Sequence, residues 1–254
     1  MQRLVAGEFG KLFTTRLWLW LLLASLALTA LYASLAIAFD ADPDNFAPSL
    51  DSPAGQRLLF AVAAGAANPL VAVLAAIGLT GEFRHKTVTA TFLATPHRGR
   101  VVAAKLVTYA LIGAAYGLAC LGVVAAIALP WLSTRDIRIP LTGNGIPATL
   151  ASVIAAVAVF AVLGVGLGAL MRDQIATVVA LLIYLFVAEP IVTRIPALGS
   201  WTMYLPGPAS SALTHTSLDN QDFLSPWQGG LVLVGYGIAF AVTGTLLAVR
   251  RDVT

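Results

Sequence analysis

Apolar residues fill most of the chain in long runs, and polar residues gather in short segments between them. A helix needs roughly 20 predominantly apolar residues to cross a bilayer. Six runs reach that length. Five of them carry no Asp, Glu, Lys or Arg, and the remaining one, 175–195, contains Glu189 and Arg194. The pattern therefore predicts an all-α membrane protein in one transmembrane domain, residues 1–254, with six spans: 17–39, 58–79, 106–132, 146–171, 175–195 and 229–249.

Composition supports the same fold class. Hydrophobic residues make up 59% of the 254 residues and charged residues only 11%, whereas soluble domains carry roughly 25% charged residues. The first apolar run is too long for the hydrophobic region of a cleavable signal peptide. The single cysteine, Cys120, lies inside an apolar run and forms no internal disulfide.

The distribution of lysine and arginine predicts the orientation in the membrane. With the N-terminus inside, four of the 15 Lys and Arg residues fall outside, namely Arg57, Arg135, Arg138 and Arg194. The other eleven fall inside, and positive residues favour the cytoplasmic side. The protein would then lie in the inner (cytoplasmic) membrane of the cell, and an even number of spans would place both termini in the cytoplasm. The inside set is Arg3, Lys11, Arg16, Arg84, Lys86, Arg98, Arg100, Lys105, Arg172, Arg250 and Arg251.

Residues 1–16 precede the first span, and on a helix their apolar and charged residues would lie on different faces. Leu4, Val5, Phe9 and Leu12 recur at helical spacing, which is typical of an amphipathic helix lying in the membrane interface. The alternative is a frayed terminus. We expect basic residues of this helix to contact anionic lipid headgroups.

Two connections are more than simple turns. Gly81 to Lys105 is the long charged break in the chain, and its middle, Thr87 to Thr95, predicts a short helix ending at Pro96. A basic, partly helical segment between spans is typical of a cytoplasmic element at the membrane surface. Residues 196–226 form a long outer loop, in which Pro208 to Thr216 has the small-residue content of a short helix. We expect short helices there that re-enter the membrane from outside. Irregular backbone at that depth is tolerated only where it is buried in protein or lines a cavity.

Three residues inside the spans are candidates for a substrate path: Asn68, Pro69 and Glu189. Pro69 removes a helical hydrogen bond and kinks the second span, so the pair is either a packing kink or a polar point on a path. An ionisable side chain at membrane depth is a functional hypothesis by default. Glu189 lies about one turn from the outer end of its span, so its carboxylate alternatively reaches the outer headgroups.

Other motifs exclude several functions. Gly164, Gly166 and Gly168 resemble a nucleotide-binding signature, but they lie inside an apolar run, where small residues let helices approach closely. The sequence has no phosphate-binding loop and no metal-ligand spacing of histidines. We therefore expect no catalytic site, no cofactor and no metal in this chain, and no nucleic-acid partner.

The charged break resembles the permease subunits of type-2 ABC exporters, the bacterial multidrug and antibiotic efflux group. That family joins its second and third helices by a Gly-Glu pair, a Thr-rich helix, a proline, a basic residue and a lysine. Here Lys86-Thr87 replaces the Gly-Thr pair that is frequent in the family. Tyr204 to Ala209, YLPGPA, resembles the family's signature before the last span, and the layout of the whole chain is similar. The matching positions in the break are Gly81, Glu82, Thr87, Thr89, Thr91, Pro96, Arg98 and Lys105.

The resemblance implies a membrane subunit without an ATPase site, driven by a separate ATPase that binds ATP and Mg²⁺. Two permeases, as a homodimer, and two ATPases would form the transporter, and residues 81–96 would be a coupling helix seated in the ATPase. The substrate exported would be a hydrophobic or amphipathic drug, antibiotic or lipid. A membrane sensor or assembly factor without transport activity is the alternative. The implied ATPase-coupling residues are Glu82, Arg84, Lys86, Val88, Phe92 and Leu93.

Overall fold

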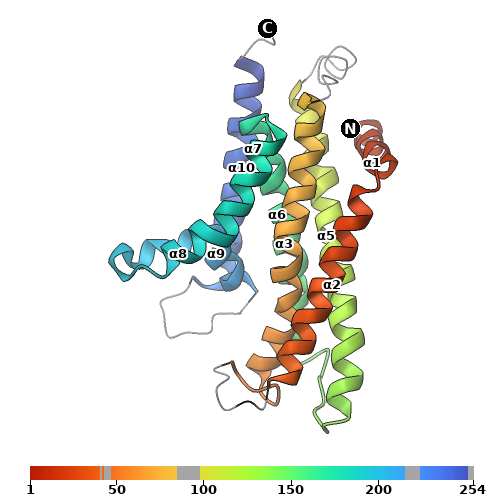
Figure 1. The fold of residues 1–254 in the computed structure, drawn as a ribbon, viewed down its shortest axis with the longest axis vertical. Helices are drawn as coiled ribbons and strands as arrows, with labels where there is room; N and C mark the ends of the chain where they lie inside the picture. The colour runs from red at the N-terminus through yellow and green to blue at the C-terminus, as the bar shows by residue number, and fades with distance from the viewer. Residues whose placement is uncertain (41, 43–46, 85–97, 215–223, 251–254) are drawn as a thin grey trace.

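The computed structural model describes residues 1–40, 42, 47–84, 98–214 and 224–250, and the regular elements among them are all helices (Figure 1). Five stretches of helix are long and apolar enough to cross a membrane. The protein therefore has the architecture of a multi-pass membrane protein. The five are α2 (Leu17–Ala38), α3 (Pro53–Arg84), α5 (Arg98–Ser133), α6 (Ile146–Met171) and the composite helix formed by α7 (Gln174–Ile183), η1 (Tyr184–Ala188) and α8 (Glu189–Thr193).

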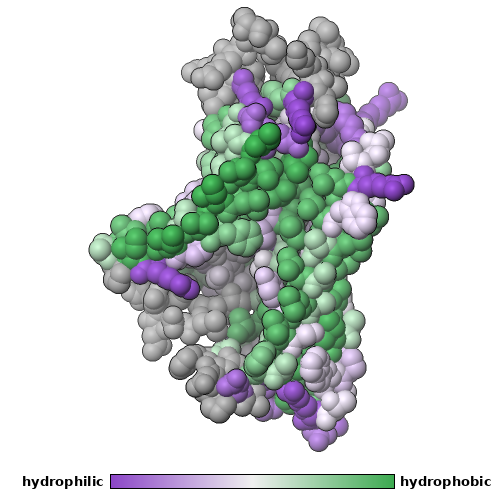
Figure 2. Space-filling view, viewed as in Figure 1, coloured by the Kyte–Doolittle hydropathy of each residue, from purple (hydrophilic) through white to green (hydrophobic). Residues whose placement is uncertain are grey.

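The sixth predicted span falls within α10 (Pro226–Arg250), a helix that packs on α6 and on α9 (Pro206–Leu213). Side chains from residue 244 onward lie outside the described set, so this crossing stays a prediction. Figure 2 shows apolar side chains across the middle of one face and hydrophilic ones near both ends of the molecule. That banding is the surface expected of a bilayer-embedded bundle.

Helices α3 and α6 form the centre of the bundle, with α2 and α5 on one side and α10 on the other (Figure 1). Glycines make the close approach possible. A Cβ at Gly164 would clash with the carbonyl oxygen of Ala72 on α3, and one at Gly166 would clash with Phe240 on α10. The predicted role of these glycines in close helix packing is confirmed.

The helices on either side of the charged break are longer than the sequence predicts. Helix α3 continues to Arg84 and α5 begins at Arg98, so Lys105 lies within a helix. The apolar pattern misses these turns because Glu82 and Lys105 neutralise each other, as described below. Of the predicted coupling segment, residues 81–96, the structure describes 81–84 as the end of α3. The short helix predicted over Thr87 to Thr95 lies outside the described residues.

The short elements follow the predicted plan in part. Helix α1 (Gln2–Thr14) is present and packs against α5. Within the outer loop, η2 (Pro196–Tyr204) is a 3-10 helix and α9 is a short α-helix before α10. Helix α9 starts two residues before the predicted one, at Pro206, because proline suits the first turn of a helix. Re-entry of these helices into the membrane stays a prediction.

Candidate functional site

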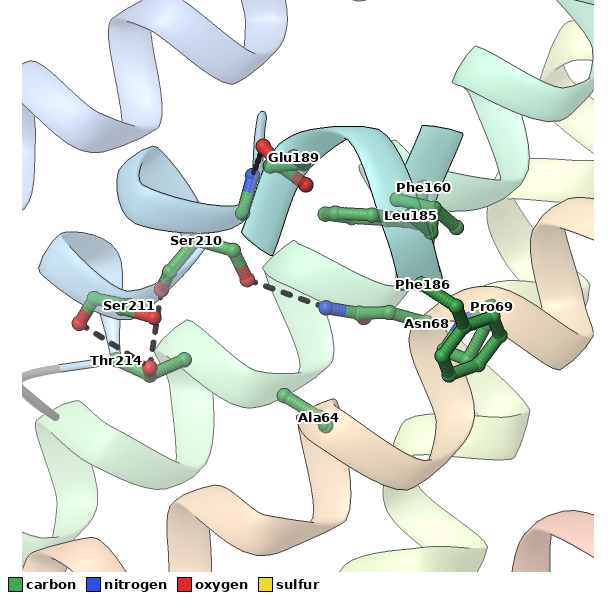
Figure 3. Close-up of a pocket in the computed structure, with 12 residues that line it drawn as sticks. Ala64, Asn68, Pro69, Phe160, Leu185, Phe186, Glu189, Ser210, Ser211 and Thr214 are labelled. Carbon is green, nitrogen blue, oxygen red and sulfur yellow. Dashed lines mark hydrogen bonds between the residues drawn. The ribbon is translucent and has the colours of Figure 1, made fainter. Parts of the chain in front are cut away.

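A pocket of about 250 Å³ opens between α3, η1 with α8, and α9, and α6 contributes Phe160 to its wall (Figure 3). The structure brings the three predicted path residues together here, although they are up to 121 positions apart in sequence (189 minus 68). The passage of a substrate through this pocket stays a prediction. The lining residues are Ala64, Gly65, Asn68, Pro69, Phe160, Leu185, Phe186, Glu189, Gly207, Ser210, Ser211 and Thr214.

Asn68 is the polar residue of α3 in this pocket and is only 6% exposed. Its side-chain nitrogen donates to the hydroxyl oxygen of Ser210 on α9, at 3.1 Å (Figure 3). Its side-chain oxygen is buried and has no hydrogen-bond partner among the described residues. Exchanging the two ends of the amide would leave its nitrogen unpartnered instead. A buried polar atom without a partner costs free energy, of about 1–3 kcal/mol.

Pro69 adds a second polar feature to the same turn of α3. Proline has no N–H, so the carbonyl of Gly65, four residues earlier, has no helical donor at position 69. A Cβ at Gly65 would meet nothing within 4 Å, so its surroundings are open on this side. At the Asn68-Pro69 pair the pocket is therefore lined by a polar backbone group, at Gly65, as well as by the Asn68 amide. Helix α3 nevertheless continues as one helix through this point.

Glu189 lies on the opposite wall and is only 6% exposed. Its Oε1 accepts the backbone N–H of Gly207 at 2.6 Å and, more weakly, the Tyr184 hydroxyl at 3.4 Å. The Gly207 contact satisfies an N–H in the first turn of α9, where a carboxylate is favoured. The Glu189 carboxylate thus bonds within the chain, and its contact with the outer headgroups stays a prediction.

The backbone before Glu189 explains its position. Pro190 cannot donate a hydrogen bond, and the preceding residues Tyr184–Ala188 form a π-helix. The Glu189 N–H accordingly bonds to the carbonyl of Tyr184, five residues earlier. The wider turn bends the composite helix away from the bundle (Figure 1). The pocket lies beside this turn.

A second polar site lies at the end of the bundle that holds α1. Lys105 of α5 contacts Glu8 of α1 and Glu82 of α3, the latter at 2.8 Å. Lys11 contacts the same two carboxylates, at 2.7 Å and 2.8 Å. We call Glu8, Lys11, Glu82 and Lys105 the inner cluster, after the side of the membrane on which the sequence predicts it. Its formal charges sum to zero, and it joins α1, α3 and α5.

Burial divides the inner cluster into two halves. Lys105 is 1% exposed and Glu8 is 8% exposed, whereas half of the Lys11 side chain is accessible. Partial burial by itself lowers the pKa of Lys11, but hydrogen bonds and charge attraction from Glu8 and Glu82 outweigh it and raise the pKa above 10.5. Lys105 is therefore a buried ion-pair partner, and Lys11 closes the cluster on the water side.

The structure describes two of the six predicted ATPase-coupling residues. Glu82 points into the inner cluster, with its side chain 13% exposed. Arg84, two residues later at the end of α3, is exposed and has Gln174 as a distant partner at 3.5 Å. Lys86, Val88, Phe92 and Leu93 lie outside the described residues. Contact of any of the six with an ATPase stays a prediction.

Sequence reasoning missed the inner cluster as a unit. The spacing of Glu8 and Lys11 gave a local signal, because residues three apart share a helix face. Lys105 was assigned to a basic loop, and its partners are 97 and 23 residues away. Within the described residues, no group of three His, Cys, Asp or Glu side chains is arranged to hold a metal ion.

Comparison of the chain with protein-family models gives no match, and comparison with curated proteins gives no significant match. A function for this chain is therefore inferred from its pocket, its inner cluster and its sequence resemblance.

Proposed function

We propose that this chain is the membrane permease subunit of an ATP-driven exporter, which moves a hydrophobic or amphipathic substrate outward with a separate ATPase. The proposal starts from the resemblance of the charged break to type-2 ABC exporter permeases. It includes a second permease copy and a cytoplasmic location for the break. The chain itself would contribute no ATPase chemistry.

The inner cluster is the observation that carries the proposal. It fixes α1 to the two helices on either side of residues 85–97. The resemblance puts the ATPase contact in residues 81–96. Buried ion pairs hold a defined geometry, because separating them leaves uncompensated charge. A push on the break would thus move the ends of α1, α3 and α5 as one body. Rigid elements of this kind transmit a conformational change between two discrete packings.

The pocket supports the substrate half of the proposal. It lies where α3 loses a helical hydrogen bond at Pro69 and where the composite helix contains a π-turn. Both features lower the cost of changing the helix direction at the pocket. A change in the packing of α3, driven from its inner-cluster end, would therefore change the shape of the pocket.

The test is ATP-driven transport by the reconstituted complex. The tagged chain is purified from its native host and its partners are identified by mass spectrometry, and a copurifying ATPase is expected. In liposomes, Arg84→Glu is expected to reduce substrate-dependent transport at least tenfold while membrane insertion stays normal. Glu82→Lys is unsuitable as the first variant, because it also breaks the inner cluster.

The matched control is Arg138→Glu, an exposed arginine in the connection between α5 and α6. It makes the same charge change away from the break and should leave transport unchanged. Isolation of the chain without any ATPase, or equal transport in the Arg84 and Arg138 variants, would contradict the coupling role. The first of these results would favour the non-transporting sensor or assembly factor.

A further inference from the structure

Two hydrogen-bond acceptors in the pocket have no donor among the described residues. One is the side-chain oxygen of Asn68. The other is Oε2 of Glu189, because both donors that reach this carboxylate go to Oε1. Native structures pair nearly all buried polar atoms, so the buried Asn68 oxygen calls for an explanation such as a ligand or a water molecule. Oε2 of Glu189 belongs to the same pocket and accepts no hydrogen bond from the described residues.

The Glu189 carboxylate also has no cationic partner in the described part of the chain. The ion pairs found there all belong to the inner cluster. Arg194, five residues after Glu189, makes none of them. A buried carboxylate is costly unless a cation or several donors compensate it, and at membrane depth this cost favours a cationic ligand.

The rest of the pocket wall is suited to an apolar group. Phe160, Leu185 and Phe186 line it, and the hydroxyl of Thr214 is already used by the backbone of its own helix, at 2.9 Å from the Ser210 carbonyl. Typical ligand pockets have volumes of roughly 300–1,000 Å³. The volume of this pocket, about 250 Å³, lies just below that range, so the pocket accommodates a small ligand or one end of a larger one.

We propose that the pocket between α3, α8 and α9 binds the ammonium end of a hydrophobic amine, with Glu189 as its counter-ion and the Asn68 oxygen as a second acceptor. An alkylammonium carries three N–H donors on a compact charge, which matches two unpaired acceptors. The neighbouring rings of Phe160 and Phe186 accommodate the carbon chain of the amine and attract the positive charge of its ammonium group. Binding follows from the pocket alone, whereas the identification of the amine as the exported substrate rests on the function proposed above.

The first experiment requires no mutation. The protein in nanodiscs is treated with dicyclohexylcarbodiimide, which modifies carboxyl groups in apolar surroundings, and labelling of Glu189 is measured by peptide mass spectrometry. Phenethylamine is expected to reduce this labelling at least fivefold. The neutral isostere 2-phenylethanol and the anion phenylacetate should leave it unchanged. Equal protection by amine and alcohol, or no protection by the amine, would overturn the proposal.

The second experiment measures phenethylamine binding by equilibrium dialysis. Removal of one member of a buried charge pair weakens binding by about 30-fold or more, and this is the loss expected for Glu189→Gln. The matched control is Asp51→Asn, which removes one carboxylate from an exposed position before α3 and should bind as the wild type does. Unchanged affinity in a folded Glu189→Gln protein would also overturn the proposal.

Failure of the inference and failure of the proposed function give different results. Amine binding at Glu189 without ATP-driven transport would leave the pocket assignment intact and remove the exporter. Transport that is insensitive to Glu189→Gln, with no protection by amine, would retain the exporter and remove the pocket assignment. Shielding of Glu189 that increases with protein density in the absence of amine would assign the pocket to a second copy and would also overturn the inference.

Discussion

At the scale of single residues, Lys105 and Lys11 form a natural pair for comparison. They contact the same two carboxylates, but Lys105 is buried and Lys11 is half exposed. Removal of one partner from a buried ion pair costs about 3–5 kcal/mol, while an exposed pair contributes about 1 kcal/mol or less. We expect Lys105→Met to lower the free energy of unfolding by the larger amount and Lys11→Met by the smaller one.

The measurement is unfolding by sodium dodecyl sulfate in mixed micelles, with helix content as the signal. Methionine keeps most of the length and apolar volume of lysine, so the comparison isolates the charge. Equal losses in the two variants would mean that burial does not control the strength of the inner cluster. A Glu8→Gln variant should resemble Lys105→Met, because Glu8 is the other buried member.

The raised pKa of Lys11 gives a pH dependence with a definite sign. The folded protein holds the Lys11 proton more tightly than the unfolded chain, whose lysine titrates near 10.5. The stabilisation by Lys11 is therefore fully present below that value and is lost as pH rises through the higher folded pKa. The difference in unfolding free energy between wild type and Lys11→Met should stay constant up to about pH 9.5 and shrink above about 10.5. A difference that grows with pH would contradict this assignment.

The residues that can be picked out from sequence are those that break a pattern. Asn68, Pro69 and Glu189 stand out because they interrupt apolar runs, and the structure places all three on one pocket. Glu8 and Lys105 interrupt no apolar run, since Glu8 lies within the amphipathic segment 1–16 and Lys105 at the end of the charged break. Their pairing depends on how α1 folds back against α5, which no local pattern encodes.

At the scale of helices, length and apolarity predicted the positions of five long apolar helices to within a few turns. The errors fall at the ends of α3 and α5 that flank residues 85–97, where tertiary ion pairs allow charged residues to continue a helix. The π-turn at Tyr184–Ala188 was also missed. Pro190 was the available signal, because a proline inside a span must change the hydrogen bonding of the preceding turn.

Close packing of α6 gives a prediction at the same scale. A Cβ at Gly164 would clash with the backbone of α3, and backbone cannot move aside as a flexible side chain does. We expect Gly164→Ala to lower the unfolding free energy by about 1–3 kcal/mol. The matched control is Gly122→Ala on α5, where a Cβ would meet nothing within 4 Å. This control should be neutral or stabilising by up to about 1 kcal/mol, and a loss as large as that at Gly164 would show that helix packing is not the cause.

At the scale of the whole molecule, the two ends of the bundle differ in what they hold. The N-terminus, the C-terminal end of α10 and the helix ends that flank the charged break lie at one end (Figure 1). Residues 47–52 and the connection 134–145 lie at the other end (Figure 1). The lysine and arginine bias predicts that the first end is cytoplasmic, and the proposed ATPase contact requires that orientation.

Single-cysteine labelling tests the orientation directly, because the native Cys120 is buried in α5 and gives little background. Cysteines replace the exposed residues Asp51 and Thr134 at one end, and Gln2 and Arg100 at the other. In intact cells a membrane-impermeant maleimide should label the first pair and not the second. After permeabilisation, all four should react. A fifth variant, Thr254→Cys, should behave as Gln2→Cys does if α10 crosses the membrane. Labelling of position 100 in intact cells would put the charged break outside, where no ATP is available to a motor protein, and the exporter proposal would then fail as a whole.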